Sequence, residues 1–404
     1  PYTTLFRSPI TYGARLSGKL NQDWRIGALN VQSERIDAKG VPTQNYSMVA
    51  LQRKVFARSN FGAYMVNKQS FIDTDLQRSN GFQPFNRDVG VEYNLASADN
   101  FWTGSVFYAN TISPLQKDQS FAQAASLAYK DNNWTFSAKE SWVGENYNPE
   151  TGYVPRVNYV QTQFDAAKNF YPKNKSTNVF YTTLSAMTMS YWNNQGTFTD
   201  NTSYVAYEGT MKDRSTFGSY LSYDYVKLLY DFDATRMGNT ALKKGTEHSW
   251  YALNARYGSS PIKLFTYTLS SRFGGYYGQG WRTGITADIG YRFQPYGSFS
   301  VALDYNDIVD VAIPGTDVAA AKKVSSNFWI IRPKIDITFS NKLFFATFFQ
   351  LNQQTKNINL NARLQWRYKP ASDLFLVYTD NYFPEIMQIR NRALVLKLNY
   401  WLNL

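Results

Sequence analysis

Apolar and polar side chains alternate along most of this chain. In the last twelve residues, ALVLKLNYWLNL, one alternating set is apolar throughout and consists of Leu394, Leu396, Leu398, Tyr400, Leu402 and Leu404. A β-strand turns successive side chains to opposite faces, so this alternation indicates a sheet whose two faces meet different surroundings. The pattern predicts an all-β fold.

The same period of two recurs in segments spread over the sequence. It is clearest in residues 88–95, 264–273, 281–293, 299–305 and 358–366. No sequence segment of comparable length has a helical period, and no change in composition marks a second domain. We therefore expect residues 9–404 to form one transmembrane, antiparallel, up-and-down β-barrel.

Composition supports a membrane barrel over a soluble protein. Aromatic residues make up 17% of the chain and charged residues only 18%, while the mean hydropathy is −0.43. No run approaches the roughly 18 apolar residues of a membrane helix. Low mean hydropathy with alternating segments and many aromatics is typical of transmembrane β-barrels. The net charge of +12 is dispersed, which argues against a nucleic-acid interface.

The connections between the predicted strands fall into two alternating sets. Short polar turns occur near 20–23, 57–60, 97–100, 130–133, 172–175, 211–214, 258–261, 294–297, 340–342 and 369–372. Longer connections lie near 34–43, 68–86, 110–118, 144–158, 231–245, 306–323 and 381–389, with shorter members of that set near 193–196, 274–280 and 353–357. Outer-membrane barrels have short periplasmic turns and longer outside loops. This predicts an outer-membrane protein with a periplasmic C-terminus.

Counting strands between these turns gives about 21, whereas a single-chain bacterial barrel has an even number. We therefore expect about 22 strands in the intact protein and one missing strand at the start of this chain. Residues 1–8, PYTTLFRS, resemble a translated sequencing adapter. The chain would then be a fragment, and the seam between its first and last strands would be irregular.

Few residues suit catalysis or metal binding. His248 is the only histidine and cysteine is absent, so the usual zinc sites are excluded. We interpret His248 as a solvated rim residue and predict neither an enzyme nor a cofactor. Carboxylates gather at Asp304, Asp307 and Asp310, with a smaller pair at Asp231 and Asp233. Such loops can hold calcium, but they lack the EF-hand spacing, so solvated loops with no metal are the preferred interpretation.

Arginines in the alternating segments are more informative. One set of arginines occupies the polar positions of the alternating segments and should therefore face the lumen: Arg272, Arg282, Arg292, Arg363 and Arg367. An arginine on the lipid face near the midplane would cost about 2–4 kcal/mol, which favours the inward assignment. These arginines could attract anionic solutes. Alternatively, they pair with inward Asp288, Asp224 and Glu92 and only hydrate the wall.

The connection at 144–158 is rich in Asn, Tyr, Pro and Gly. Its Tyr147 and Tyr153, with Tyr159 just beyond, could stack on sugar rings, because aromatic side chains offer flat apolar faces. The alternative, which the pattern favours, is that they belong to an outer aromatic girdle.

Several segments resemble a family of outer-membrane barrels common in Bacteroidota, whose members carry an N-terminal module like the family-9 carbohydrate-binding domains. The resemblance runs from about residue 9 to the end, and VGENYNPETGYVPR at 143–156 is its most specific part. The other matching segments are ITYGARLSGKL (10–20), WRIGALN (24–30), NRDVGVEYNL and FWTGSVFY (86–108), and INLNARLQWRYKPASDLFLVYTDNY (358–382). The resemblance implies a saccharide as the solute.

We therefore expect an outer-membrane β-barrel that passes or handles a polar solute. The alternatives are the barrel half of a TonB-dependent receptor, and an outer-membrane enzyme or adhesin. The expected partners of an outer-membrane barrel are the lipid bilayer with its lipopolysaccharide and the barrel-assembly machinery. The resemblance adds an N-terminal periplasmic domain that is missing from this chain, and no nucleic acid is expected.

Overall fold

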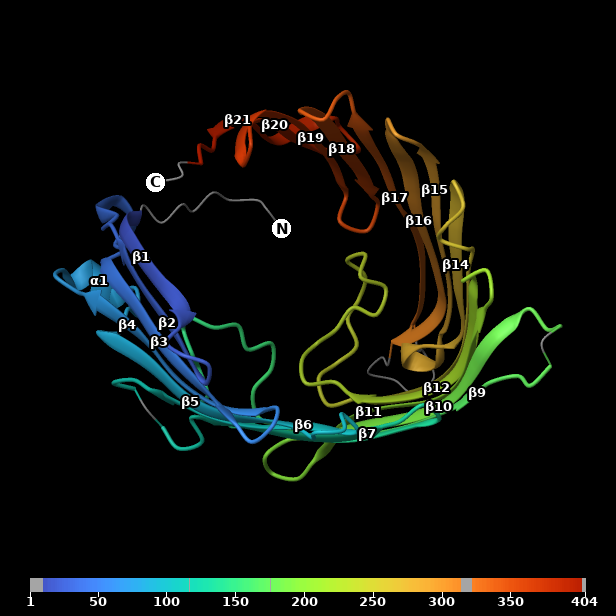
Figure 1. Cartoon of the computed structure of the whole chain (residues 1–404), viewed down its shortest axis with the longest axis horizontal. Coiled ribbons are helices and arrows are strands. Elements are labelled where there is room, and N and C mark those ends of the chain that lie inside the picture. Colours follow the sequence, from blue (N-terminus) through green and yellow to red (C-terminus); the bar gives the residue numbers. More distant parts are fainter. Residues whose placement is uncertain (1–9, 116, 175, 314–321, 402–404) are drawn as a thin grey trace. The chain divides into compact units, whose positions relative to one another are not determined.

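The computed structural model describes residues 10–115, 117–174, 176–313 and 322–401, and it is all-β (Figure 1). One antiparallel sheet contains 21 strands. The prediction of an all-β, antiparallel fold with about 21 strands is therefore confirmed. The predicted adapter segment, residues 1–8, lies outside the described residues.

The strands follow one another along the chain with very little helix between them. They are β1 (Ile10–Lys19), β2 (Trp24–Ser33), β3 (Thr43–Val55), β4 (Ser59–Phe71), β5 (Phe85–Ala96), β6 (Trp102–Ile112), β7 (Phe121–Lys130), β8 (Trp134–Val143), β9 (Tyr159–Phe170), β10 (Val179–Trp192), β11 (Phe198–Met211), β12 (Thr216–Lys227), β13 (Glu247–Gly258), β14 (Phe265–Gly275), β15 (Trp281–Phe293), β16 (Gly297–Ile313), β17 (Lys322–Thr338), β18 (Leu343–Asn352), β19 (Asn357–Lys369), β20 (Ser372–Phe383) and β21 (Gln388–Leu398). The helical turns are η1 (Asp37–Lys39), α1 (Asp75–Ser79) and η2 (Tyr277–Gln279).

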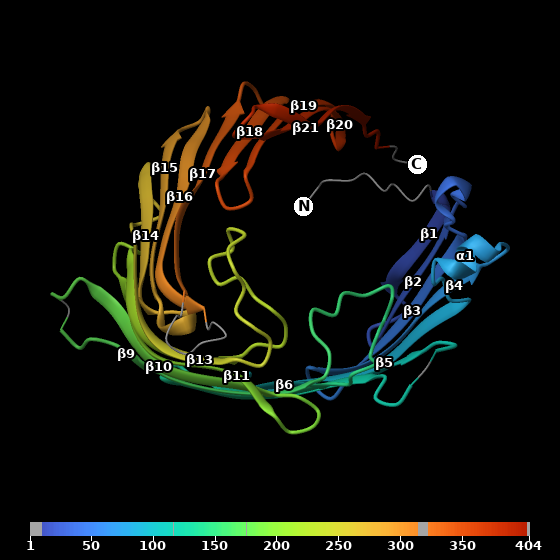
Figure 2. The same cartoon turned by 180° about the vertical axis from the view of Figure 1, so that it is seen from behind.

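The chain divides into two compact units. Unit 1 contains the described residues up to 168 and residues 186–201, and unit 2 contains residues 169–185 and the described residues from 202 onwards. In unit 1, β1 to β9 pair in chain order, and in unit 2, β12 to β21 do the same (Figures 1 and 2). Consecutive antiparallel strands need only short local connections, which suits the frequent polar turns in the sequence.

In unit 1, the strand register separates the side chains into an apolar face and a polar face. Phe61, Tyr93 and Val106 lie opposite one another on β4, β5 and β6. The adjacent row, on the other face, is Asn60, Asn94 and Ser105, and the amide of Asn94 donates to the side-chain oxygen of Asn60 at 3.1 Å. The alternation in the sequence therefore corresponds to two chemically distinct faces.

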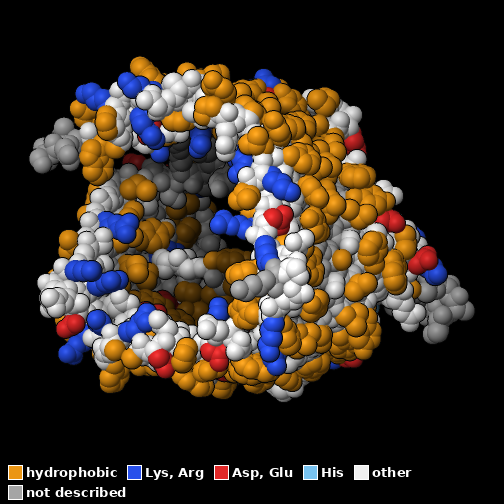
Figure 3. Space-filling view, turned by 45° about the vertical axis from the view of Figure 1, so that its right-hand side comes forward, with side chains coloured by type: hydrophobic (Ala, Val, Ile, Leu, Met, Phe, Trp, Pro, Cys, Tyr) orange, Lys and Arg blue, Asp and Glu red, His pale blue; other side chains and the backbone are white. Residues whose placement is uncertain are grey.

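Unit 2 has the same two faces. Leu269, Ala287 and Leu303 form one row across β14, β15 and β16, and Ser270, Thr286 and Asp304 form the next row on the other face. The apolar face is uncovered, and Leu269, for example, is 47% exposed. In Figure 3, which brings the side of β14 to β17 forward, hydrophobic side chains dominate the right-hand part of the surface, and Lys and Arg side chains are mostly in the centre and on the left.

The two sets of connections are also present in the structure. Turns such as 131–133 and 370–371 alternate with loops such as 144–158 and 228–246. The predicted connection at 306–323 is too long: β16 continues to Ile313 and β17 begins at Lys322, so residues 306–313 and 322–323 are strand, while residues 314–321 lie outside the described residues. A register shift between Ile308 and Val311 allows the extension. No helix in the described ranges is long and apolar enough to cross a bilayer.

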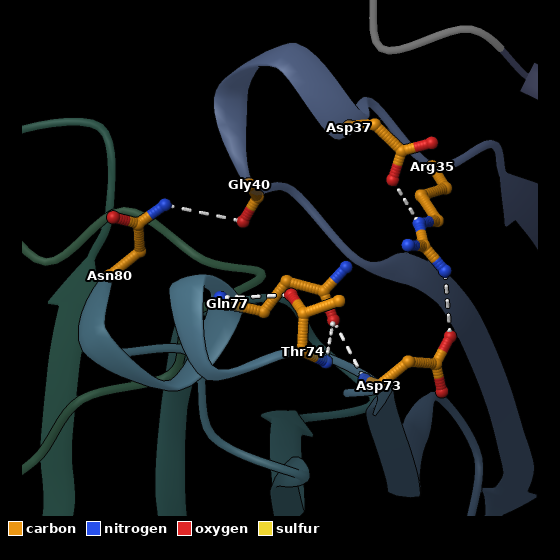
Figure 4. Close-up of polar contacts among 7 residues, drawn as sticks. All are labelled: Arg35, Asp37, Gly40, Asp73, Thr74, Gln77 and Asn80. Carbon is orange, nitrogen blue, oxygen red and sulfur yellow. Dashed lines mark hydrogen bonds and ion pairs between the residues drawn. The ribbon is translucent and has the colours of Figure 1, made fainter.

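Helix α1 closes the β4–β5 loop with a capping box. The Thr74 hydroxyl accepts from the Gln77 backbone N–H, and the Gln77 side chain accepts from the backbone N–H groups of Asp73 at 2.8 Å and Thr74 at 3.3 Å (Figure 4). Such reciprocal bonds satisfy donors that a helix N-terminus leaves unpaired. Gln77 is only 1% exposed, so its side chain is a buried structural group.

The α1 segment also fixes the β2–β3 loop. Arg35 pairs with Asp37 in its own loop and with Asp73 at 3.1 Å (Figure 4). The Asn80 side chain donates to the carbonyl oxygen of Gly40 at 3.3 Å. Gly40 has φ of +60°, and a Cβ there would lie 2.6 Å from the Asn80 amide nitrogen, so the close contact requires glycine. Two loops thus form one layer at this end of unit 1.

Replacing Gln77 by alanine should loosen the α1 segment without unfolding the sheet. The backbone N–H groups of Asp73 and Thr74 would lose their buried acceptor, at a local cost of about 1–3 kcal/mol. We expect hydrogen exchange at these two amides to accelerate about fivefold or more.

The matched control is Arg78→Ala on the same helix. The Arg78–Asp75 ion pair is exposed, so its loss should change local stability by less than about 1 kcal/mol. Equal exchange rates in Gln77→Ala and Arg78→Ala would contradict the structural role of the capping box.

Candidate functional site

In unit 1, the β8–β9 loop (residues 144–158) lies over the polar face. The row beneath it runs from Tyr159 through Val143, Ala122, Ala109 and Gly90 to Tyr64. The small residues leave space for the loop and for the Tyr64 ring. A Cβ on Gly90 would lie 2.4 Å from a ring carbon of Tyr64. The small residues of three neighbouring strands thus leave a shallow recess on this face.

Polar contacts attach the loop to the wall of the recess. The Asn86 side chain donates to the carbonyl oxygen of Asn148 at 3.0 Å and accepts from the backbone N–H of Glu150 at 3.1 Å. The Thr111 hydroxyl accepts from the backbone N–H of Asn148 at 3.3 Å. Lys68 forms an ion pair with the Glu150 carboxylate. The loop therefore has one defined position over β4, β5 and β6.

Tyr147 inserts into the recess and is 8% exposed. It packs with Ala109, Ala122 and Val143 in a small apolar core. Burial raises the pKa of the Tyr147 hydroxyl, and the negative charge of Asp88 adds to the rise. The Tyr64 hydroxyl donates to the same Asp88 carboxylate at 2.7 Å. Two tyrosines therefore share one carboxylate beneath the loop.

A cavity of about 550 Å³ lies beside this carboxylate. Its walls are largely aromatic and apolar, and they include all three tyrosines of the predicted sugar-stacking loop: Tyr147, Tyr153 and Tyr159. Tyr153 is 88% exposed. Tyr147 and Tyr159 lie on the polar-face side, so these two are not part of a band of aromatics on the apolar face. Their role in stacking stays a prediction.

The cavity also has residues that sequence reasoning did not single out. The Arg156 guanidinium lies 5.7 Å from the Tyr159 ring and 4.9 Å from the Tyr191 ring, and it pairs with Asp200 at 2.7 Å. Asp88 and Tyr64 complete the polar part of the wall. Only the strand register brings Asp88 and Tyr64 together under the loop. Flat rings next to fixed polar groups suit a ligand with a ring and hydroxyl groups.

In unit 2, the β12–β13 loop (residues 228–246) also packs on the polar face (Figures 1 and 2). Leu228, Ala234 and Leu242 of the loop form a small core with residues of β16, β17 and the η2 turn, namely Tyr276, Ile308, Val311, Ile313, Val324 and Phe328. This loop therefore has its own apolar anchor, as the loop of unit 1 does.

Asp233 organises the interior of this loop. Its carboxylate accepts from the backbone N–H groups of Thr235, Met237, Gly238 and Asn239 at 2.8–3.0 Å, and from the Thr235 hydroxyl at 2.7 Å. Burial raises the pKa of Asp233, but the hydrogen bonds from Thr235, Gly238 and Asn239 outweigh burial and leave the pKa below its ordinary value. Asp231 instead pairs with Lys243 at 2.9 Å. These carboxylates fold the loop and do not converge on a metal position.

The carboxylates of residues 304–310 do not converge either. Asp304 pairs with Arg332 and accepts from the Thr286 hydroxyl at 2.9 Å on the polar face. Asp307 lies three residues after Asp304 in the same strand, so its side chain is on the opposite face of the sheet. Asp310 lies 3.8 Å from Lys323. Among the described residues there is no group of three or more potential metal ligands.

His248 differs from the solvated rim residue that the sequence suggested. It is half-buried in β13, and its Nδ1 accepts from the backbone N–H of Gly278 at 3.2 Å. Its Nε2 lies 2.9 Å from the Thr246 hydroxyl, and its ring makes a T-shaped contact with the Tyr277 ring. The histidine therefore holds the η2 turn against β13, a long-range contact that sequence spacing does not reveal.

The five arginines predicted to line a lumen all lie on the polar face of unit 2. Arg292 and Arg363 even share a row, through Ser298, Asp336 and Ala346. Arg272 and Arg282 line a second, larger cavity, whereas Arg292 donates to the carbonyl oxygens of Pro261 and Lys263. Arg367 pairs with Asp373 at 3.2 Å. Within the described part of the chain, none forms an ion pair with Asp288, Asp224 or Glu92; that the face lines a lumen stays a prediction.

Comparisons with known proteins bear on the family and the fold. A family model described as "Domain of unknown function (DUF5916)" matches residues 11–312. Among solved structures, the siderophore receptor PirA from Acinetobacter baumannii is similar, with a TM-score of 0.49 and 7% sequence identity, over 91% of this chain and 72% of that chain. A likeness of this degree gives no information on what this chain binds. A search of curated proteins finds no match.

Acid should release the loop 228–246. The folded loop holds the pKa of Asp233 below its ordinary value of 3.8, so the carboxylate stabilises the loop at neutral pH. That stabilisation is lost as the pH falls through the lowered pKa, because protonation removes an acceptor of several hydrogen bonds. Hydrogen exchange of residues 231–240, measured from about pH 5 to about pH 2 and corrected for intrinsic rates, should show the loss.

Asp233→Asn is the matched variant, since it keeps the size of the side chain and removes the charge. It should exchange faster than the wild type at neutral pH and show a much smaller response to acid. A variant that responds to acid as the wild type does would mean that another group controls the loop.

Proposed function

The chain belongs to the family described as "Domain of unknown function (DUF5916)", and we propose that it is a β-barrel of the outer membrane that passes or handles a polar solute. In this proposal, the apolar face of the sheet meets lipid and the polar face lines a water-filled interior. The long connections face outside, and the short turns and the C-terminus face the periplasm.

One observation carries the proposal, namely that the apolar face is left uncovered across many neighbouring strands. Large apolar side chains are exposed there in both units, among them Phe61, Val106, Leu253, Leu269 and Ile285. Monomeric soluble proteins rarely expose a contiguous apolar surface of this extent. A bilayer covers such a face, and strands can cross it because their backbone groups are bonded to neighbouring strands.

Closure of the sheet follows from the same requirement. β1 is exposed at every residue and β21 at nearly every residue. In lipid, an open strand edge would leave backbone donors and acceptors unsatisfied, so we propose that the sheet is part of a closed barrel in the membrane. The bilayer with its lipopolysaccharide and the machinery that inserts such barrels would then be its partners.

The finer proposal is that the polar solute is a saccharide. It is supported by the cavity under the 144–158 loop, where Tyr147, Tyr153 and Tyr159 share a wall with Asp88 and Arg156. Aromatic faces can cover the apolar side of a sugar ring, while charged and polar groups hydrogen-bond its hydroxyls. The large exposed fraction of Tyr153 leaves its ring accessible to a ligand.

A charge on the apolar face should destabilise the protein in lipid. Leu269→Arg would place a guanidinium near the middle of β14 on that face, at a cost of about 2–4 kcal/mol if it meets the bilayer midplane. Urea unfolding from lipid vesicles measures this cost.

The control is Thr268→Arg, one residue earlier. Thr268 lies on the polar face opposite Asp288, so its guanidinium would remain hydrated beside a carboxylate. We expect a much smaller change in the free energy of unfolding. Equal destabilisation by Leu269→Arg and Thr268→Arg would show that the apolar face does not meet lipid.

The protein should make vesicles permeable to polar solutes. When it is reconstituted into liposomes, we expect faster entry of glucose and maltose than in protein-free liposomes, because a wide barrel holds more interior space than its side chains fill. Tyr153→Ala should change the maltose concentration at which the rate of entry saturates. Tyr230 is an exposed tyrosine of the 228–246 loop, and Tyr230→Ala should not change this concentration. Liposomes that remain impermeable to both sugars would refute the transport proposal.

A further inference from the structure

We propose that the larger cavity, in unit 2, binds an anion, the carboxylate or phosphate group of a polar solute. The inference rests on the proposed function and narrows the class of solute. The cavity has a volume of about 870 Å³ and lies on the polar face between β10 and β17. A cavity of this size accommodates a ligand as large as a small oligosaccharide or sugar acid.

Four arginines reach this cavity from four consecutive segments. Arg236 comes from the 228–246 loop, Arg256 from β13, Arg272 from β14 and Arg282 from β15. The register explains why they gather, since Arg272 lies opposite Asn254 on β13, and Arg256 lies opposite Ser270 on β14. The sequence spacing of these arginines alone would not bring Arg236 into the group.

Two of the arginines are fixed in position by the protein. Arg272 donates to the carbonyl oxygen of Arg282 at 3.1 Å and to that of Gly275 at 2.8 Å. Arg282 donates twice to the side-chain oxygen of Asn306, at 2.7 and 3.2 Å. Both guanidinium groups lie over the ring of the buried Tyr276, at 5.8 and 5.5 Å from its centroid. A guanidinium has five N–H donors, so each retains donors for a ligand.

The cavity has more positive than negative charge. Its carboxylates are Glu208 and Asp304, and Asp304 is already paired with Arg332. Among the described residues, none of the four arginines forms an ion pair with a carboxylate. The two guanidinium groups held over one ring repel each other; the carboxylate of Asp224 offsets part of this repulsion at Arg272, and a bound anion would reduce it further.

Guanidinium groups suit carboxylates and phosphates in particular. Their planar fork donates two parallel hydrogen bonds to two oxygens of either group. Tyr181, Tyr220 and Asn254 line the same cavity and can donate to the hydroxyls of the remaining solute. This combination fits a hydroxylated anion better than a neutral sugar.

The experiment compares matched probes on the full chain reconstituted in lipid nanodiscs. Glucuronate, glucose and inorganic phosphate are titrated by calorimetry at low ionic strength. We expect glucuronate to bind about tenfold or more tightly than glucose, because charge-assisted hydrogen bonds add to those of the hydroxyls. Phosphate binding as well would identify a general oxyanion site, and glucuronate binding alone would identify a carboxylate site; either supports the proposal.

The variant R236Q/R256Q removes two charges that are exposed, so the Tyr276 packing remains intact. It should weaken glucuronate binding about tenfold and leave glucose binding unchanged. The control, R58Q/R78Q, removes two exposed arginines of unit 1, so that both double variants have the same net charge. Equal affinity of the wild type for glucuronate and glucose, or equal loss in both double variants, would overturn the anion site. Liposome entry of neutral sugars would persist in that case, so the anion site can fail while the transport proposal stands.

Discussion

The structure depends on one constraint: the sheet satisfies its backbone by pairing between neighbouring strands, yet in the described part of the chain no second sheet or helical layer covers its apolar face, and only loops pack on its polar face. Each strand in chain order supplies the donors and acceptors of the next. The side chains must then suit whatever lies on either side. Alternation of apolar and polar residues is the direct result, and it explains why a chain with a low mean hydropathy can present a broad apolar surface.

The strands and turns could be predicted because their signals are local. A period of two and clusters of turn residues are present in the sequence whatever the partners of a strand are. Residues 306–313 resemble a loop in the sequence because Asp304, Asp307 and Asp310 are typical of a polar connection. In the structure, pairing with β17 and a bulge extend the strand instead.

The candidate sites were only partly predictable, because they depend on register between distant residues. The alternation of the strands places Arg272 and Arg282 on the same face, but it says nothing of Arg236, which reaches the cavity from the folded 228–246 loop. Tyr147 could be identified as an aromatic of a long connection, while its contact with Asp88 required the register of β5 and β6. The position of His248 against Gly278 likewise depends on how a turn folds back.

The recess under the 144–158 loop has a consequence for how this protein can change over generations. Gly90 admits the Tyr64 ring only because it has no side chain, and Ala109 and Ala122 leave room for Tyr147. A larger residue at Gly90 would displace the Tyr64 ring, and a larger residue at Ala109 or Ala122 would displace Tyr147 and its loop. A larger loop residue would need a smaller strand residue. Mutations in the loop and in this row are therefore coupled, and a family that diversifies its loop has to diversify the row beneath it in step.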